Sequence, residues 1–371
     1  MKKFVVFAGI AVVALASCSK TESVLNNPQQ TGSAITFQPL AAVQTKSTLI
    51  NKYVEGTGSF NVYAWYQATA TSTNFDPSKD YTLYMNNVTC KYDPEAGDID
   101  KGENAQGVNT WKPANIYYWP KNGNLTFSAY YPTTISDKVE VTAANGIKIS
   151  DYTVSNPSDQ IDVMFSDRAY DRYSTTQTDL VKEYDGVDIV FNHALSAASF
   201  TVKTANDYVA DAIKLRKIEV VNAKTTGTFS ENCNNGRNDD THKPEWTWAD
   251  NTTNYTIYSV EGAGETVTTA GWQAGADCIF LPQNFSNDIA IKVTYAIKYI
   301  DGNEPKYLEQ TAEFPLKATT TGVDPMTAIT AWEMGKWYKY TFTFTLNEIY
   351  FAPSVKDWDV VEVNPIEVKE N

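Results

Sequence analysis

The chain has 371 residues and a formal net charge of −14 at neutral pH. This length is enough for two domains that each bury a core, and the acidic balance argues against binding to nucleic acid or to anionic lipid through basic patches. Tyrosine occurs 23 times against 5 methionines, and Thr, Val, Ile and Phe are also frequent, which favours strands.

The N-terminus has the pattern of a secretory signal. Lys2 and Lys3 precede an apolar run over residues 4–16, which is too short to span a bilayer as a mature helix. Leu15-Ala16-Ser17 directly before Cys18 indicates a lipoprotein signal over residues 1–17, with Cys18 acylated by palmitate. An ordinary signal peptide followed by an incidental cysteine is the alternative. Residues 18–33 are polar and turn-rich, and we expect them to form a lipidated tether.

Alternation of polar and apolar residues dominates the remaining chain. It is clearest over residues 60–65, 125–130, 289–295 and 338–346. This pattern is typical of strands with one dry and one wet face in antiparallel sandwiches. Asp301-Gly302 predicts a hairpin turn. Because no long amphipathic helix pattern occurs, the fold class is all-β, with two tandem antiparallel β-sandwiches of about seven strands each.

Polar stretches mark the expected joints. Residues 155–186 are rich in Asp, Ser and Thr, and a new strand begins at Val187-Asp188-Ile189-Val190-Phe191. We therefore expect an N-terminal sandwich over residues 34–186 and a C-terminal sandwich over residues 187–371. The polar stretch over residues 231–254 predicts a surface excursion of the second sandwich.

Three cysteines remain once Cys18 is assigned to lipid, which excludes a full disulfide framework. Cys233 and Cys278 lie in the same half of the chain and are able to pair in an oxidising compartment. The favoured interpretation is that Cys90, Cys233 and Cys278 are buried free thiols that behave as small hydrophobic residues.

The sequence carries no pattern of an enzyme, and we expect neither catalysis, cofactor nor metal. His193 and His242 are the two histidines, and no Gly-x-Ser-x-Gly, His-Glu-x-x-His or P-loop motif occurs. His193 is expected to be structural. Two weak alternatives for a metal site exist. One is His242 with Asp239 and Asp240. The other is an acidic turn with Asp98, Asp100 and Glu103, whose spacing does not fit the twelve-residue calcium loop.

Several segments together resemble the fimbrillin family of Gram-negative lipoprotein pilins, the type V pilins. They are the Cys18 lipobox, residues 35–37, 117–120, 125–132, 191–196, 332–340 and 349–358. The resemblance implies two transthyretin-like sandwiches in a lipidated precursor at the cell outer membrane. It also implies cleavage by a trypsin-like protease, which removes the first strand and leaves a groove. A strand from another fimbrillin subunit then fills the groove, giving an extracellular fimbria for adhesion and biofilm formation, with a host glycan or protein as a further partner.

The residues around the expected first strand can be compared with that mechanism. The removable segment is residues 34–46, and Ile35, Phe37 and Leu40 are its large apolar side chains. No charged residue occurs between Ser23 and Thr45, and Lys46 follows. The first arginine is Arg168, whereas the family often has arginine at the cleavage position. Cleavage between Lys46 and Ser47 therefore requires a protease that accepts lysine; Lys52 is a second candidate, and the alternative for Lys46 is a lysine on a solvated loop.

A donor strand must place side chains into the pockets of the strand that it replaces. The C-terminal tail, residues 359–371, has the same order of apolar residues around a proline as residues 35–43. The candidate donor residues are Val361, Val363, Ile366 and Val368, with Pro365 at the step of Pro39. Chance similarity between two edge strands is the alternative.

Two other functions remain open on the sequence. A fimbrial tip or anchor subunit would lack either the removable strand or the free tail. A monomeric, lipid-anchored carbohydrate-binding sandwich would use Trp246 and Trp248, which occupy alternate positions, as a platform for stacking sugars.

Overall fold

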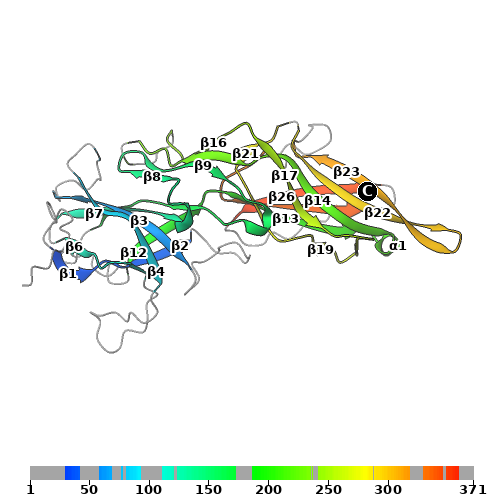
Figure 1. Ribbon diagram of the computed structural model, residues 1–371, viewed down its shortest axis with the longest axis horizontal. Coiled ribbons are helices and arrows are strands. Elements are labelled where there is room, and N and C mark those ends of the chain that lie inside the picture. The colour runs from blue at the N-terminus through cyan, green and yellow to red at the C-terminus, as the bar shows by residue number, and fades with distance from the viewer. Residues whose placement is uncertain are drawn as a thin grey trace, which may run out of the picture.

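The computed structural model describes residues 30–41, 58–68, 77, 81–92, 111–120, 123–172, 186–234, 236, 241–286, 288–317, 329–345 and 348–358. These residues form an elongated all-β molecule with two lobes of sheet lying end to end (Figure 1). Helical structure in these described ranges is limited to three short turns: η1 Thr133–Ile135, η2 Pro157–Asp159 and α1 Asp207–Ala210. Within the described part of the chain, no helix is long and apolar enough to cross a membrane.

The N-terminal lobe is built on one sheet that closes into a ring. Its order is β10 (Met164–Ser166), β12 (Val187–His193), β2 (Phe37–Ala41), β5 (Trp111–Pro113), β4 (Thr82–Tyr92), β3 (Ser59–Gln67), β7 (Asn124–Tyr131) and β11 (Ala169–Arg172). The ring closes because β10 also pairs with β7, through Met164 opposite Tyr131. A separate pair, β1 (Gln30–Ala34) with β6 (Tyr118–Pro120), lies beside it.

The C-terminal lobe consists of two larger sheets packed face to face. One has the order β19 (Trp272–Gln273), β13 (Ser196–Thr204), β25 (Lys336–Phe344) and β26 (Ile349–Asp357), with β20 (Cys278–Phe280) also on β13. The other has the order β17 (Thr252–Ser259), β14 (Ile213–Lys224), β22 (Ala290–Asp301) and β23 (Glu304–Pro315), with β18 (Glu265–Thr266) also on β14. A short pair, β21 (Gln283–Asn284) with β24 (Ala331–Trp332), completes the lobe.

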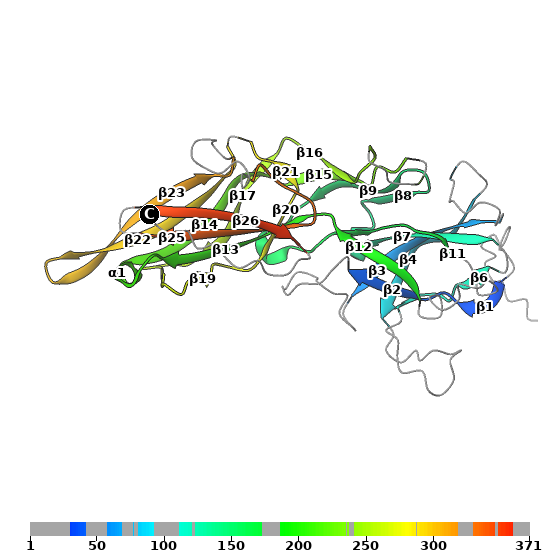
Figure 2. The ribbon, with the colours of Figure 1, turned by 180° about the vertical axis from the view of Figure 1, so that it is seen from behind.

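A fourth sheet joins the two halves of the chain. Its order is β16 (Glu245–Trp248), β15 (Thr226–Ser230), β9 (Gly146–Thr153) and β8 (Val139–Thr142). Here the β8–β9 hairpin of the first half pairs with β15 of the second half, and Figure 2 shows this sheet along one side of the molecule. Strand β12 likewise continues the N-terminal ring past residue 186. Sheets therefore cross residue 186, and the division into two domains there stays a prediction.

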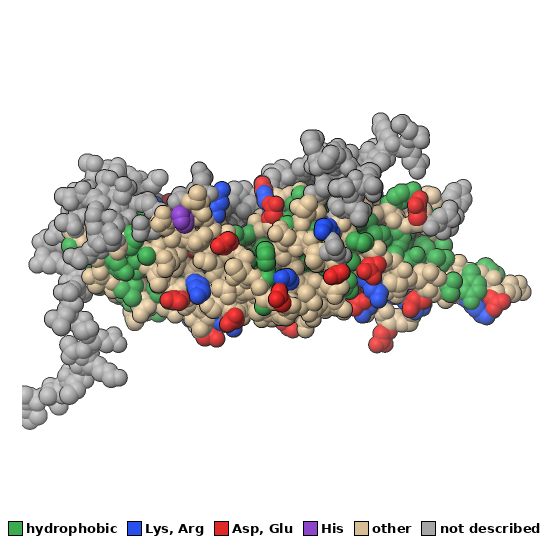
Figure 3. All heavy atoms as spheres, turned by 90° about the horizontal axis from the view of Figure 1, so that it is seen from above, with side chains coloured by type: hydrophobic (Ala, Val, Ile, Leu, Met, Phe, Trp, Pro, Cys, Tyr) green, Lys and Arg blue, Asp and Glu red, His purple; other side chains and the backbone are tan. Residues whose placement is uncertain are grey.

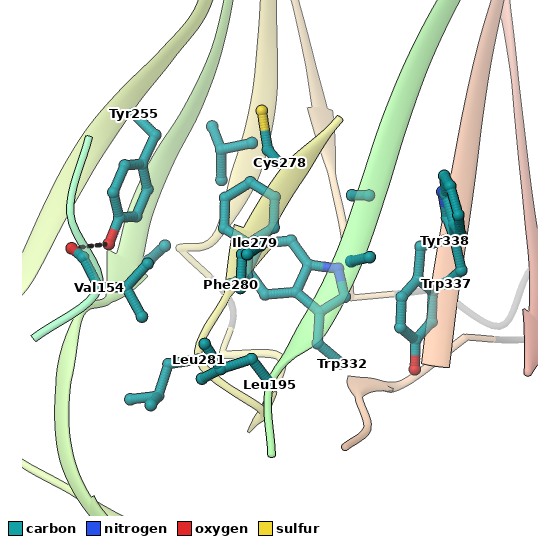
Figure 4. Packing of buried hydrophobic residues seen from close by; sticks show 14 of the residues in the cluster. Val154, Leu195, Tyr255, Cys278, Ile279, Phe280, Leu281, Trp332, Trp337 and Tyr338 are labelled. Carbon is teal, nitrogen blue, oxygen red and sulfur yellow. Dashed lines mark hydrogen bonds between the residues drawn. The ribbon is translucent and has the colours of Figure 1, made fainter. Parts of the chain in front are cut away.

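Two clusters of buried side chains hold these sheets together. The smaller cluster fills the ring of the N-terminal lobe and includes Phe37, Phe60 and Phe127. The larger cluster runs through the C-terminal lobe, where Trp332 stacks on Phe280 with ring centroids 4.3 Å apart and the Tyr255 hydroxyl donates to the Val154 carbonyl at 3.1 Å (Figure 4). Because Val154 follows β9, the larger core also binds the first half of the chain.

The sequence predictions of strands are confirmed over residues 60–65, 125–130, 290–295 and 338–344. The hairpin is also confirmed, although its two-residue loop is Gly302-Asn303, with Gly302 at φ +68°, a conformation that suits glycine. The expected wet face is wrong for β3 and β7, which are buried on both faces. One face of β3 contributes Val62 to the ring core, and the other contributes Tyr63 and Trp65 to the larger cluster.

The surface carries charges of both signs. On the face seen in Figure 3, acidic and basic side chains of the described residues are interspersed, with apolar side chains between them. The polar excursion over residues 231–254 is not wholly superficial, because Glu231 and Trp246 are buried.

Candidate functional site

Strand β2 is the first strand of the chain in the ring, and it lies between β12 and β5. It pairs in parallel with β12 over five consecutive positions, from Phe37 opposite Val187 to Ala41 opposite Phe191. The Val187 amide donates to the Thr36 carbonyl at 2.8 Å. Among the described residues, pairing with β5 is limited to Phe37 opposite Trp111. Most of the main-chain pairing of β2 is therefore with the edge of β12.

The side chains before and at the start of β2 fill the ring core. Ile35 is 1% exposed and Phe37 is fully buried. The Phe37 ring meets Phe127 edge-on at a centroid distance of 5.5 Å and Phe60 at 6.1 Å. Edge-to-face aromatic packing of this kind adds to the burial of apolar area. The first strand therefore supplies an integral part of the core of the N-terminal lobe.

The strand register decides which residues of β2 face that core. Val187, Ile189 and Phe191 of β12 are buried, whereas Asp188 and Val190 are partly exposed. Since paired residues point to the same face of a sheet, Phe37, Pro39 and Ala41 hold inner positions. Leu40 is opposite Val190, at an outer register position; its side chain lies outside the described residues.

Pro39 is compatible with this place in the sheet. The Ile35 amide donates to the Tyr117 carbonyl at 2.7 Å, on the side away from β12, while the Thr36 carbonyl faces β12. The alternation of a strand then points the nitrogen of Pro39 away from β12. Proline thus removes no hydrogen bond from the β2–β12 ladder, consistent with the rule that it sits where a strand nitrogen has no partner in the sheet.

The far end of β12 lies beside the end of the described chain. His193 Nδ1 is 2.6 Å from Asp162 Oδ2, and both side chains are buried. The His193 ring stacks on Trp358 with centroids 3.9 Å apart and planes 5° apart. The Trp358 amide donates to the Gly335 carbonyl at 2.9 Å. The expectation of a structural His193 agrees with this buried setting, and the stacking places Trp358, the last described residue, next to β12, the strand that pairs with β2.

The junction of the two halves also contains a buried arginine. The Arg168 guanidinium donates to the carbonyls of Ala143 and Thr142 at 2.6 and 2.9 Å, and its Nε lies 3.6 Å from Glu231 Oε1. Glu231 Oε2 accepts from the Ile147 amide at 2.8 Å. This group ties the loop between β10 and β11 to the β8–β9 hairpin. Nothing in the local sequence around Arg168 marks it as buried.

The three remaining cysteines are free and buried, as the favoured interpretation expected. Desolvation raises the pKa of Cys90, and desolvation together with Asp277 raises the pKa of Cys278 to about 12. The pKa of Cys233 is also raised, first by burial and then by Glu231, whose Oε1 accepts from the thiol at 3.1 Å. Raised thiol pKa values make all three cysteines poor nucleophiles.

The sugar-stacking platform does not form as expected. Trp246 is 6% exposed and its indole N–H donates to the Ala194 carbonyl at 2.6 Å. Trp248 is 38% exposed and donates to the Pro282 carbonyl at 2.5 Å. Two exposed rings, as the carbohydrate-binding alternative requires, are not present here, because Trp246 packs between Phe229 and Tyr152 in the core.

Several predicted residues lie outside the described residues. They are the lipidation site Cys18, the cleavage residues Lys46 and Ser47, the donor residues Val361, Val363, Ile366 and Val368, and the acidic residues Asp98, Asp100, Glu103, Asp239 and Asp240. His242 is described, with its Nδ1 2.9 Å from the Thr241 hydroxyl. Over the described ranges, no group of three or more His, Cys, Asp or Glu side chains is arranged to hold a metal ion.

One part of the site was missed by sequence reasoning. The strand Val187–His193 was expected to open the second sandwich, and its pairing with β2 in the sheet of the N-terminal lobe was not foreseen. Its alternation of buried and partly exposed residues identifies it as a strand, and a strand pattern gives no information about its partner. Only the pairing with β2, about 150 residues earlier in the chain, reveals its role.

Comparison with known proteins agrees with this architecture. A family described as fimbrillin-like matches residues 45–358. A crystal structure of a fimbrial protein from Bacteroides vulgatus is similar in fold, with a TM-score of 0.55 and 15% identity, covering 87% of this chain and 99% of that chain. A crystal structure of a candidate cell adhesion protein from Bacteroides uniformis has a TM-score of 0.50 and 18% identity, covering 89% of this chain and 100% of that chain. No curated protein matches the chain. Because the family match spans most of the sequence, the chain belongs to the fimbrillin-like family of structural fimbrial subunits.

Proposed function

We propose that this protein is a structural fimbrial subunit that polymerises by strand exchange after its first strand is removed. The observation that carries the proposal is the place of β2 in the ring. It is the first strand in chain order there, it fills the core with Phe37, and it pairs along the edge of β12. Removing the chain up to Lys46 would take this strand away together with β1, which pairs with β6, and would leave every later described strand intact.

The loss of β2 would leave a groove that favours refilling. Ile35 and Phe37 are almost wholly buried, and each such side chain contributes about 1.5–3 kcal/mol through burial. The unpaired edge of β12 would also expose main-chain donors and acceptors, which invite a new strand. A strand added at this edge would restore both contributions.

The C-terminal tail is the proposed donor. If it takes the register of β2 with Val363 in the place of Phe37, then Val361, Val363 and Pro365 fall on inner positions of the groove. Ile366 and Val368 would follow at outer positions, the first of them at the place of Leu40. Valine is smaller than phenylalanine, so the replacement would fill the Phe37 pocket less completely.

The remaining steps follow the expected route of a lipoprotein pilin. We propose that Cys18 carries lipid in the precursor at the outer membrane, and that a trypsin-like protease accepting lysine cleaves between Lys46 and Ser47. Other copies of the same subunit are the proposed partners, and the product is an extracellular fimbria that supports adhesion and biofilm formation.

Charged substitutions in the tail test the donor assignment. The double variant Val361→Asp, Val363→Asp is expected to abolish detergent-resistant ladders on gels, because two carboxylates would enter an apolar groove. The monomer is expected to fold normally, measured by its thermal unfolding. The matched control Glu362→Gln, at an outer position between them, should polymerise like the unchanged protein. Normal ladders from the double variant would reject the tail as donor.

A further inference from the structure

Strands β12 and β13 form one continuous pass between the two lobes, and the main chain shows which elements share an edge of it. On β12, the Val187 amide faces β2 and the Val190 carbonyl accepts from Asp167 on the β10 side. The main-chain N–H and C=O groups of odd-numbered residues therefore point toward β2, and those of even-numbered residues point toward β10.

The same alternation continues into the C-terminal lobe. The Leu195 carbonyl accepts from the Gly335 amide, directly before β25. The Phe200 carbonyl accepts from the Ala274 amide, directly after β19. The main-chain groups of odd-numbered residues thus face β2 on β12 and β25 on β13, while those of even-numbered residues face β10 and β19. Strands β25 and β2 therefore lie end to end along the same edge of the β12–β13 pass.

Strand β26 leads toward the groove along this edge. It runs antiparallel to β25, from Phe344 opposite Ile349 to Lys336 opposite Asp357, so its end points from the C-terminal lobe to the N-terminal lobe (Figure 2). Strand β25 lies between β26 and β13 along its whole length, and it begins directly after Gly335. Beyond this end of β25, nothing of β25 lies between the chain that leaves β26 and the β12–β13 pass. Trp358 enters there and stacks on His193, the last residue of β12.

The tail is therefore positioned to continue into the groove of its own chain. Phe191 is two residues from His193, about 7 Å along the strand, and Val361 is three residues beyond Trp358. In an antiparallel register that places Val361 opposite Phe191, Val363 falls opposite Ile189 and Pro365 opposite Val187. Val361 and Val363 then form hydrogen-bonded pairs with β12, and Pro365, which has no N–H, ends the ladder at the first residue of β12. A slip of one residue would place Glu362 opposite the buried Ile189, which the hydrophobic pattern opposes.

We infer that, once the first strand is removed, the C-terminal tail of the same chain closes its own groove by pairing antiparallel with β12. This inference rests on the proposed function, because the groove opens only through removal of β2. The processed subunit then has a closed state in which its tail is stored and its groove is covered. Exchange between subunits begins when this tail is released.

Tethering makes the closed state the expected one in dilute solution. Only Asp359 and Val360 separate Trp358 from Val361, and a short tether gives an effective concentration of about 1 mM. At about 1 µM subunit, the tail of the same chain would then outcompete the tail of another by roughly 10³-fold. Polymerisation should accordingly rise steeply with the local concentration of processed subunits.

A pair of cysteines distinguishes the two occupants of the groove. The variant carries Asp188→Cys and Asn364→Cys. Positions 188 and 364 are opposite each other at outer positions in the closed register. They are also opposite each other when a donor from another subunit takes the register of β2. The experiment uses the full chain with Cys18→Ser and a specific protease site inserted between Lys46 and Ser47. The native cysteines of the described residues are buried and should not compete. Before cleavage, Gln38 is opposite Asp188, so no cross-link is expected.

After cleavage at about 1 µM and mild oxidation, the expected product is a monomer with an internal disulfide, in a yield that does not change on tenfold dilution. Cross-links found only between chains, in mixtures of the two single-cysteine variants, would overturn the closed state and leave strand exchange standing. No cross-link within or between chains would overturn both proposals. The control pair Val260→Cys and Asn364→Cys uses an exposed residue outside the N-terminal lobe and should give no internal disulfide.

Discussion

Phe37 is the residue on which the first strand depends most. Its ring is fully buried between Phe60 and Phe127, whereas Leu40 holds an outer register position. The three apolar residues expected to anchor the strand therefore do not occupy equivalent places. Ile35 and Phe37 are core residues of the N-terminal lobe, and Phe37 is the larger of the two.

We predict that Phe37→Ala lowers the unfolding free energy of the unprocessed chain by about 3–5 kcal/mol, because it leaves a cavity in a closed aromatic cluster. Denaturant unfolding measures the change. Leu83→Ala is the matched control, since Leu83 is 44% exposed and should change stability by less than about 0.5 kcal/mol. Equal effects of the two substitutions would show that β2 is not packed as described.

Among the elements, β2 and the β8–β9 hairpin show best what the sequence could and could not predict. Alternation identified β22 and β25, because a half-buried strand imposes a period of two on its own residues. It also located β3 and β7, although these strands are buried on both faces. Partners of strands could not be found in this way. The pairing of β12 with β2, and of β9 with β15, joins residues far apart in the chain, and no local pattern encodes it. The burial of Trp246 was missed for the same reason, since Phe229 comes from the partner strand β15.

Arg168 holds two of these elements together, and its removal should weaken the junction. We predict that Arg168→Met lowers the unfolding free energy by about 3–5 kcal/mol, because it leaves the buried Glu231 carboxylate without its cation. The control is Arg216→Met, which removes a more exposed ion pair with Glu309 and should cost about 1 kcal/mol or less. A loss for Arg168→Met no larger than for the control would contradict a role for Arg168 at the junction.

The burial of Arg168 also bears on processing. Its side chain is fully buried, and a protease needs an accessible, extended segment around the bond that it cuts. The first arginine of the chain is thus protected in the folded protein, and the proposed removal of the first strand is therefore expected at a lysine nearer the N-terminus.

At the scale of the whole molecule, the two lobes are joined by sheets that cross the middle of the chain rather than by a single linker. The fourth sheet and the β12–β13 pass both run through this region (Figure 1). The C-terminal tail starts at the same level, beside His193. Strand β2, strand β12 and Trp358, after which the C-terminal tail begins, therefore lie around one edge of one strand pass, which is the arrangement that the proposed strand exchange requires.

The central claim is that the first strand is removed when the subunit enters a fimbria. The most direct measurement is the N-terminal residue and intact mass of the protein sheared from the cell surface. The account predicts a start at Ser47, without Cys18 and its lipid. A lipidated start at Cys18 in all of the material would contradict it, because β2 would then remain in the ring and the groove along β12 would never open.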